Sequence, residues 1–546
     1  MLIETTNKDN LTEEQSAAVE STAQNLILLA GAGTGKTHTS IARLKHLILS
    51  KNIKADNILC LTFTRSAAEE FKMRCADLPE TPFIGTFHEF CYRLVLSNSA
   101  IMKCLGYSSV PKILEDFEDE EYRAKVKLQM GIKLSNKKLN NRSLCTPKDI
   151  PEYEAFHSGL KMHFRKDCVI NFDYLCQEVC SLFIKNNPAI RRYKQQYRYI
   201  FVDEFQNTDD TQWNFVKSFT ESNRFLVGDM MQSIYLFRNA SPQIIKDIVG
   251  NPEWTVLKLT TNFRSNQEIL DYANKIHPSD KYEDYKVDLV SSQGQGGHCE
   301  VVDVSNRESL EKFLITDLES LESKDIAILT RTNWDVQKIQ SLLEANGIPY
   351  TTNNSNTITE FEHFIHSVQS NEYMLTYLTS KLSGDKYYEF LGSRHFGELK
   401  EQTTTDTIKH MYNNYGTVIG SLVHKVNKFR SVLFSQKTTY EKYRELCDVV
   451  DISPIDAYEQ VFVEDTTNAA LYDAILDTFE TNHKDSSSGI YVGTIHSAQG
   501  LEYDTTILTD VGSKEFKIDT DENKFLYYVG VTRAKHRLII YKYKIT

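Results

Sequence analysis

Short apolar runs alternate with longer amphipathic stretches along most of the chain. In the first half these runs lie at residues 26–29, 57–64, 83–88, 199–202 and 225–227. Short continuous apolar runs are typical of buried strands, and the helical periodicity that follows several of them, for example over residues 66–74, predicts intervening helices. This alternation predicts a parallel sheet whose functional side chains lie at the carboxyl ends of its strands.

A second region of the same kind begins near Trp254. Its candidate strands lie at residues 256–259, 300–304, 326–330, 490–494, 506–508 and 538–541. Mainly helical stretches at about residues 101–190 and 353–485 interrupt the two regions. We therefore predict an α/β fold of two parallel-sheet domains, each carrying a mostly helical insertion. The predicted bounds are residues 1–98 and 192–255 for the first domain, 99–191 for its insertion, 256–352 and 486–546 for the second domain, and 353–485 for its insertion.

Composition agrees with a globular protein of several domains. The chain has 546 residues, of which 41% are hydrophobic and 25% charged, and single cores stop growing at roughly 250–300 residues. The amino-terminal residues are acidic and amide-rich, and no segment approaches the about 18 apolar residues of a membrane span. We therefore expect a soluble, cytoplasmic protein with no membrane partner.

Charge and cysteine usage narrow the classes of partner. A net charge of −12 argues against a surface devoted entirely to nucleic acid, but a local basic channel remains possible because only the contacted phosphates matter. The acidic run at residues 115–121 and the lysines that follow it are interpreted as solvated helix faces.

Among ten cysteines, Cys168, Cys176 and Cys180 come nearest to a cluster, but gaps of seven and three residues fit no zinc pattern. We expect buried, reduced thiols.

The segment AGAGTGKT follows the first predicted strand and opens a helix. Its residues are Ala30, Gly31, Ala32, Gly33, Thr34, Gly35, Lys36 and Thr37. Glycines allow backbone N–H groups to converge on an anion, the helix terminus adds positive potential, a lysine reaches the β- and γ-phosphates, and a hydroxyl ligates Mg²⁺. Ala30 stands where the general pattern has its first glycine, and a glycine-rich turn without ligand is the alternative. We predict a phosphate-binding loop.

Two later strands end in acidic residues. Residues 199–202 lead into Asp203 and Glu204, and residues 225–227 lead into Gly228 and Asp229. A pair of carboxylates at a strand end can hold a magnesium ion and activate water. A helix cap is the alternative for an isolated pair, but the phosphate loop upstream favours the metal-nucleotide interpretation.

The motifs together resemble those of superfamily 1 helicases of the UvrD/Rep type. In chain order they are LTEEQ at residues 11–15, AGAGTGKT at 30–37, LTFTRSAAEEFKMR at 61–74, GTFHEF at 85–90, VDEFQNT at 202–208, VGDMMQSIYLFRNA at 227–240, LTTNFRS at 259–265, TIHSAQGLEYD at 494–504 and YVGVTRAKHRL at 528–538. They span nearly the whole chain in the order of the family. The resemblance implies two RecA-like P-loop motor domains with ATP bound between them.

The resemblance also implies roles for residues of the nucleotide site. Lys36 and Thr37 would hold phosphate and Mg²⁺, Asp203 would position the metal, and Glu204 would activate the attacking water. The γ-phosphate would be contacted by Gln232, and Arg264 and Arg533 would act as arginine fingers. The adenosine would be bound by Gln15 at the adenine edge, by Phe263 stacking on the base, by Glu502 at the ribose and by His38 at the position of a common arginine.

The family's single-strand track maps onto six residues of this chain, Phe63, His88, Tyr235, Phe237, Arg238 and His496. Aromatic rings stack on bases without reading sequence, and a few cations follow the backbone. The resemblance therefore implies a 3′-to-5′ translocase on single-stranded DNA that unwinds duplexes at their junctions with single strands.

This sequence departs from the family pattern at several positions. Met230 and Met231 replace a usual acidic pair, and Gln499 replaces a common lysine. The second insertion, about 130 residues, is shorter than the accessory domain of the housekeeping enzymes. In this compactness the chain resembles helicase subunits of antiviral defence systems such as Gabija, which work with a separate nuclease. The alternatives are an ATP- and DNA-sensing regulatory subunit of such a nuclease complex and an RNA-directed motor.

Overall fold

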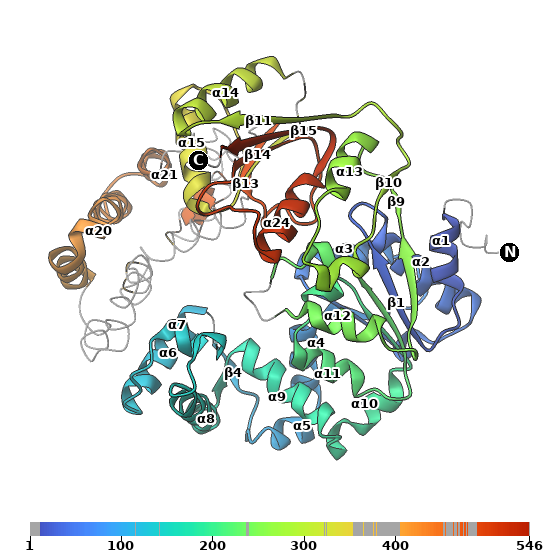
Figure 1. The fold of residues 1–546 in the computed structure, drawn as a ribbon. Helices are drawn as coiled ribbons and strands as arrows, with labels where there is room; N and C mark the ends of the chain where they lie inside the picture. Colours follow the sequence, from blue (N-terminus) through green and yellow to red (C-terminus); the bar gives the residue numbers. More distant parts are fainter. Residues whose placement is uncertain are drawn as a thin grey trace. The chain divides into compact units, whose positions relative to one another are not determined.

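The structure is a computed structural model that describes residues 11–114, 116–140, 142–235, 240–321, 323, 325–352, 404–450 and 489–544, with single residues and short runs between 364 and 478. The chain divides into two compact units (Figure 1). The first unit consists of residues 1–105, 173–352 and 488–546, and the second of residues 106–172 and 353–487. Both units are therefore assembled from segments that are distant in sequence.

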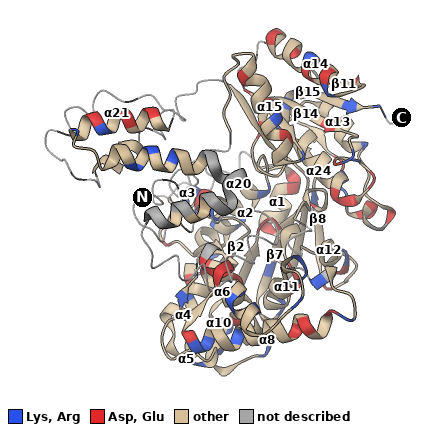
Figure 2. Cartoon of the chain, turned by 90° about the vertical axis from the view of Figure 1, so that its left-hand side faces the viewer, with Lys and Arg blue, Asp and Glu red and all other residues tan. Residues whose placement is uncertain are grey.

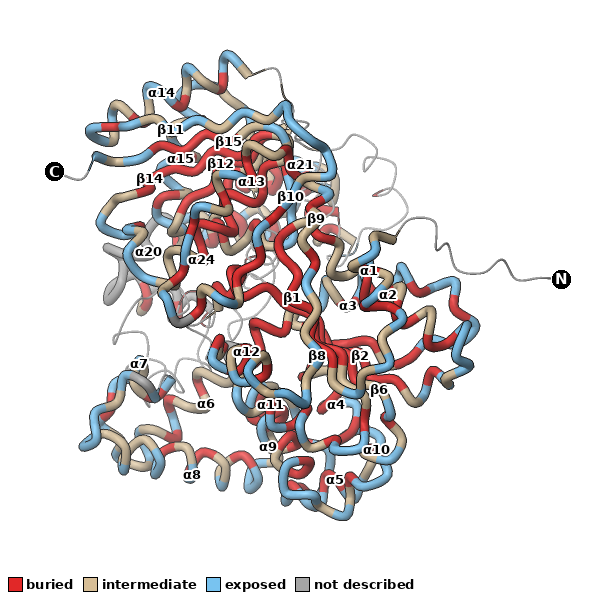
Figure 3. The backbone as a smooth tube through the Cα atoms, turned by 45° about the vertical axis from the view of Figure 1, so that its right-hand side comes forward, coloured by how far each residue is buried: buried red, intermediate tan, exposed pale blue. Residues whose placement is uncertain are grey.

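The first unit contains a six-stranded parallel sheet in the order β3-β2-β6-β7-β1-β8. Its strands are β1 (Asn25–Ala30), β2 (Ile58–Thr62), β3 (Phe83–Thr86), β6 (Tyr199–Val202), β7 (Asn223–Gly228) and β8 (Thr255–Leu259). The central strands β1, β2 and β6 are buried along nearly their whole length (Figure 3). The predicted parallel sheet is confirmed. The third apolar run is shorter than predicted, since Thr86 caps a helix that begins at Phe87.

The prediction that residues 256–259 open the second sheet is wrong. β8 pairs in parallel with β1, with Leu26 opposite Thr255 and Ala30 opposite Leu259. Leu259 is buried, and its side chain joins the core of the first sheet. The periodicity of a strand shows that a segment is extended but not with which strand it will pair. Here β8 pairs with β1 and forms the edge strand of the first sheet.

A second parallel sheet in the same unit has the order β11-β15-β14-β12-β13. Its strands are β11 (His298–Val304), β12 (Ile326–Thr330), β13 (Ile490–Thr494), β14 (Tyr503–Val511) and β15 (Ala534–Tyr543). These confirm the remaining strand predictions of the second region, with β14 and β15 longer than expected. A two-stranded parallel ladder of β9 (Thr261–Asn262) and β10 (Val290–Ser291) follows β8.

Helices lie in most of the connections between consecutive strands, although turns alone connect β13 to β14. In the first unit they are α1 (Glu13–Glu20), α2 (Lys36–Lys45), α3 (Arg65–Arg74), α4 (Phe87–Ser97), α5 (Ser99–Cys104), α9 (Phe172–Ile184), α10 (Arg191–Gln196), α11 (Asp210–Lys217), α12 (Pro242–Val249), α13 (Gln267–Asn274), α14 (Arg307–Ser320), α15 (Asn333–Ala345) and α24 (Asp521–Val531). Shorter helical turns include the 3-10 helices η6 (Phe205–Asn207) and η7 (Met230–Gln232). None of the helices that the structure describes is both long and apolar enough to cross a membrane.

The second unit is mostly helical in its described part. It contains α6 (Asp116–Gln129), α7 (Asn136–Asn140), α8 (Ile150–Asp167), α20 (Thr404–Leu433), α21 (Thr439–Val449) and a short ladder of β4 (Lys112–Ile113) with β5 (Val169–Ile170). Along α6, Arg123 pairs with Asp119 and Lys125 with Glu121. Acidic and basic residues likewise alternate along α21 (Figure 2). The predicted solvated face is wrong at Glu121, which is buried, and the Asp119 side chain is also largely covered.

Candidate active site

The phosphate loop lies between β1 and α2 in a conformation that only glycine adopts easily. Gly33 and Gly35 have φ values of 67° and 79°, in the left-handed region that disfavours side chains. The Thr34 hydroxyl donates to the carbonyl of Gly31 over 2.8 Å and closes the turn within the loop. The loop therefore has the tight backbone that an anion cradle needs at the start of α2.

Two polar side chains hold this loop from outside. The Gln15 amide donates from Nε2 to the Thr34 carbonyl over 3.1 Å, while its Oε1 accepts from the Thr12 N–H in a capping box at the start of α1. On the other side, Asn262 donates from Nδ2 to the Ala32 carbonyl over 2.6 Å. The loop is thus fixed both by the helix that precedes β1 and by the segment that follows β8.

The carboxylate pair lies at the end of β6, where it was predicted. Burial, and then the neighbouring charge of Glu204, raise the pKa of Asp203 to about 7, against the attraction of Lys36 and a hydrogen bond with Thr37. The buried Oδ1 of Asp203 has no hydrogen-bond partner. An unpaired carboxylate oxygen beside a hydroxyl and a phosphate loop fits Mg²⁺, a hard cation that takes oxygen ligands. Asp203 and Thr37 are the residues that would hold it.

Gln206 connects this pair to the next strand. Its Nε2 donates to Glu204 and its Oε1 accepts from the backbone N–H of Asp229 over 3.1 Å. Asp229 in turn accepts from the Gln232 amide over 2.7 Å. A Cβ at Gly228 would come within 2.8 Å of Gln206 Oε1, so the glycine allows this approach. The chain Glu204–Gln206–Asp229–Gln232 couples the predicted base to the predicted phosphate sensor.

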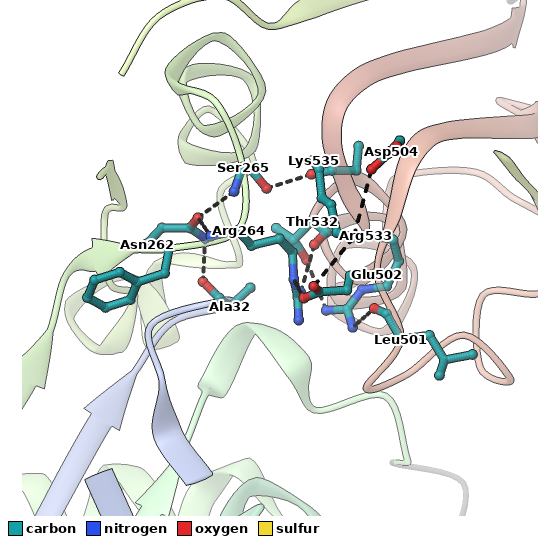
Figure 4. Close-up of polar contacts among 12 residues, drawn as sticks. Ala32, Asn262, Arg264, Ser265, Leu501, Glu502, Asp504, Thr532, Arg533 and Lys535 are labelled. Atoms are coloured by element: carbon teal, nitrogen blue, oxygen red, sulfur yellow. Dashed lines mark hydrogen bonds and ion pairs between the residues drawn. The ribbon is translucent and has the colours of Figure 1, made fainter. Parts of the chain in front are cut away.

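The two predicted arginine fingers lie close together (Figure 4). The Arg264 guanidinium donates from Nε to Glu502 over 2.8 Å and from Nη1 to the Thr532 carbonyl over 2.9 Å. Arg533 is buried and donates to the carbonyls of Val529 and Leu501. Burial, followed by repulsion from Arg264, lowers the pKa of Arg533 to about 9, while Glu204 opposes the shift. Residues of both sheets therefore shape the electrostatics of one site.

Asn262 supports Arg264 as well as the phosphate loop. Its Oδ1 accepts from the N–H groups of Arg264 and Ser265, each over 2.8 Å, and its side chain is fully buried. The Ser265 hydroxyl continues the connection to the Ala534 carbonyl over 2.6 Å. One amide thus fixes the loop and the arginine segment relative to each other.

The residues predicted to contact adenosine lie around the same loop. Phe263 is 41% exposed and donates its backbone N–H to the Gly33 carbonyl over 2.9 Å, so its ring is accessible for stacking. His38 is exposed near the start of α2. Glu502 is occupied by Arg264, and Lys535 lies 3.6 Å from its other oxygen. The structure places Glu502 next to an arginine finger, a neighbour that the motif alone does not indicate.

Three of the rings predicted to contact DNA form a row. The centroids of Phe63 and Tyr235 lie 5.0 Å apart, and those of Tyr235 and His496 lie 6.2 Å apart. All three side chains are partly exposed. Phe63 follows β2, Tyr235 follows η7 in the segment after β7, and His496 follows β13, so the connections of both sheets contribute to the row. Phe237 and Arg238 lie outside the described residues.

His88 lies in the first turn of α4, just after β3, the strand that pairs with β2. Its Nε2 is 3.1 Å from Asp173 Oδ1 on α9. Burial disfavours the charged ring, but the bond to Asp173 and the neighbouring thiol and carboxylate groups outweigh it and raise the pKa of His88.

Sequence reasoning did not single out Gln206, Asn262 or Lys535. Each lies inside a motif segment that was used for the resemblance, so the signal was their position within VDEFQNT, LTTNFRS and YVGVTRAKHRL. Their roles became visible only with their hydrogen-bond and ion-pair partners.

Comparison with known protein families gives two matches. Residues 11–251 match the UvrD/REP helicase N-terminal domain, and residues 257–360 and 352–544 match the UvrD-like helicase C-terminal domain. Together these matches cover both sheets of the first unit.

Two similar relatives are bacterial helicases. The ATP-dependent DNA helicase PcrA of Staphylococcus aureus (strain Mu50 / ATCC 700699) is 25% identical over an alignment of 619 positions, which covers 97% of this chain and 83% of the relative. The ATP-dependent DNA helicase PcrA of Staphylococcus epidermidis (strain ATCC 12228 / FDA PCI 1200) is 25% identical over 615 residues with the same coverage.

Proposed function

The chain belongs to the UvrD/Rep-type superfamily 1A helicases, and from that premise we propose that it is an ATP-driven motor that moves 3′-to-5′ along single-stranded DNA and unwinds duplexes. ATP-dependent DNA helicase activity is the activity of this family. The direction, the residue roles and the coupling of hydrolysis to stepping are our proposal. We also propose that it acts in the cytoplasm, where its DNA substrate would be met.

The single observation that carries the proposal is the meeting of three groups in one unit. The phosphate loop, the carboxylates Asp203 and Glu204, and the arginines Arg264 and Arg533 influence one another electrostatically. Phosphoryl transfer needs little covalent chemistry from a protein and depends on positioning and charge stabilisation. This set of residues supplies both.

In the proposed reaction Lys36 and the loop N–H groups bind the phosphates. A magnesium ion held by Thr37 and Asp203 would neutralise charge on the β- and γ-phosphates. Glu204, oriented by Gln206, accepts a proton from the attacking water. Arginine fingers stabilise the charge that develops on the transferred group, an effect worth about 10³–10⁵ in rate in related enzymes.

Stepping requires DNA contacts that change with the nucleotide state. The row formed by Phe63, Tyr235 and His496 draws on the ends of strands from both sheets. Base–ring stacking is worth about 1–3 kcal/mol per base and tolerates any sequence. A change in the spacing of the sheets would therefore alter the stacking positions, and we propose that this change moves the strand.

The test is ATP hydrolysis with and without single-stranded DNA. The Lys36→Ala variant should abolish the DNA-stimulated rate, whereas Lys51→Ala, an exposed lysine beyond α2, should leave it unchanged. Absence of DNA stimulation in the unsubstituted chain, or equal rates in the Lys36→Ala variant, would refute the proposal. Duplexes with 3′ or 5′ tails then test the direction, and DNA and RNA strands of one sequence test the RNA-directed alternative.

A second candidate is an ATP- and DNA-sensing regulatory subunit of a nuclease-containing defence complex. The short second insertion, about 130 residues between Asn353 and Asp485, motivates it. A sensor would hydrolyse ATP on DNA without processive unwinding. Strand separation by the isolated chain at a rate comparable to its ATP turnover would count against this candidate, and a nuclease encoded by the adjacent gene would favour it.

A further inference from the structure

Three buried cysteines from two helices meet in the first unit. Cys91 lies on α4, and Cys176 and Cys180 lie one turn apart on α9. Their sulfur atoms all lie within 4.8 Å of one another. The Sγ of Cys176 is 3.7 Å from that of Cys91 and 4.0 Å from that of Cys180. The cluster was not predicted, because Cys91 is 85 residues from Cys176 in sequence.

These separations match the edge of a metal tetrahedron. With zinc–sulfur bonds of about 2.3 Å, two thiolates on one tetrahedral ion lie about 3.8 Å apart. A disulfide would bring the sulfurs to about 2.05 Å, and the three cysteines are free thiols. Sulfur ligands select soft or borderline ions such as Zn²⁺. The three thiols are therefore already spaced as ligands of one ion.

His88 lies one turn before Cys91 on the same helix, but neither of its ring nitrogens belongs to the group of ligand atoms that lie within 4.8 Å of one another. His88 hydrogen-bonds through Nε2 to Asp173, three residues before Cys176 on α9. A metal-bound histidine commonly gives its second ring nitrogen to a carboxylate, which fixes the orientation of the ring. With Nε2 on Asp173, Nδ1 is the nitrogen that a rotation of the ring toward the thiols would offer to the ion.

We propose that Cys91, Cys176 and Cys180 form a structural zinc site that joins α4 to α9, and that the His88 ring turns toward the thiols to complete it when the ion binds. Taken with Cys168, the C-x₃-C pair on α9 fits no zinc pattern, but the fold brings Cys91 to this pair instead, and a gap of three residues by itself is within the range seen for zinc ligand pairs. On the same helices Phe90 and Phe183 pack with each other and with Phe215, with centroids 4.8–6.3 Å apart, and all three cysteines are buried. Burial of the three thiols suits a structural site on that side, while the His88 side is open to solvent.

A zinc ion at this site would stabilise two helices of the motor, an inference that rests on the proposed function. α4 begins directly after β3, and α9 begins where the chain re-enters the first unit. A zinc ion would hold these two helices together and fix the first turn of α4. The metal itself needs no ATP or DNA, so its presence can be tested separately from helicase activity.

The first test measures zinc in the full chain, purified without a polyhistidine tag from zinc-supplemented cells. Elemental analysis should find one equivalent of zinc per chain. Cys91→Ser and Cys180→Ser should lose it, whereas Cys60→Ser, an equally buried cysteine on β2, should keep it. Unsubstituted chain without zinc, or the same zinc content in all variants, would overturn the proposal. The zinc content of the unsubstituted chain tests the proposal even if a variant fails to fold.

The second test identifies the ligands. Chain produced with cobalt in place of zinc should show thiolate-to-cobalt charge-transfer absorption and the strong visible bands of tetrahedral Co²⁺. His88→Ala should weaken metal retention against a chelator, and His88→Cys should restore it by providing a fourth thiolate. Cobalt bands that persist unchanged in Cys176→Ser, or a Cys91–Cys176 disulfide in a non-reducing peptide map, would overturn the assignment.

Discussion

Replacing Asn262 tests the connection between the phosphate loop and the arginine segment. Its amide makes three hydrogen bonds of 2.6–2.8 Å, to the Ala32 carbonyl and from the N–H groups of Arg264 and Ser265. Each is worth about 0.5–1.5 kcal/mol net, so an alanine loses about 2–4 kcal/mol in all. About 1.4 kcal/mol corresponds to a tenfold change, so we expect kcat/KM for ATP to fall by roughly 10- to 100-fold. The rest of the lost interaction energy should appear as a lower free energy of unfolding.

The assay is steady-state ATP hydrolysis at saturating single-stranded DNA. Asn266→Ala is the matched control, because Asn266 is also buried and bonded, to His536 over 2.7 Å, but none of its hydrogen bonds reaches the phosphate loop. We expect the control to keep kcat/KM within about threefold, since the bond that it loses is worth only about 1 kcal/mol and lies away from the loop. Equal losses in the two variants, or an Asn262→Ala enzyme within twofold of the unsubstituted chain, would refute the reasoning.

Three further predictions concern other contacts. Gln206→Ala removes the bridge between Glu204 and Asp229, so kcat should fall about tenfold with nucleotide affinity retained; an unchanged kcat would contradict the bridge. Tyr235→Ala should weaken single-stranded DNA binding by about 1–3 kcal/mol in fluorescence anisotropy, and a smaller loss would remove it from the row of rings. Burial lowers the pKa of His157 to about 4, below its unfolded value of about 6.5, so its contribution to stability is present above pH 6.5 and lost as the pH falls toward 4. Melting temperatures measured across that range should depend less on pH in His157→Gln.

The order of strands and helices follows from local sequence. Continuous apolar runs such as residues 58–62 become strands buried on both faces, because only the interior of a parallel sheet covers both sides. The turn at Gly33 and Gly35 is equally local, since the positive φ values there depend on the absence of a side chain. These features can therefore be predicted from the local sequence alone.

The sheet to which a strand belongs is not local. β8 has the pattern of an ordinary strand, yet it completes the first sheet, where the burial of Leu259 in that core favours the pairing. The sequence shows the extended segment and its apolar positions. Which edge it meets depends on the helices and strands that are already placed around it.

The residues of the candidate active site show the same difference between local sequence and tertiary structure. Sequence by itself determined which residue types were available, including the phosphate loop, the acidic pair and the two arginines. Only the tertiary structure decided which partners these residues have. Asn262 hydrogen-bonds to a loop 230 residues away, and Glu502 forms an ion pair with Arg264. The sulfur atoms of Cys91 and Cys176 come into contact. A hydrogen bond or a sulfur contact depends on distances of a few ångströms, and positions separated by a hundred residues acquire such distances only when the chain has folded.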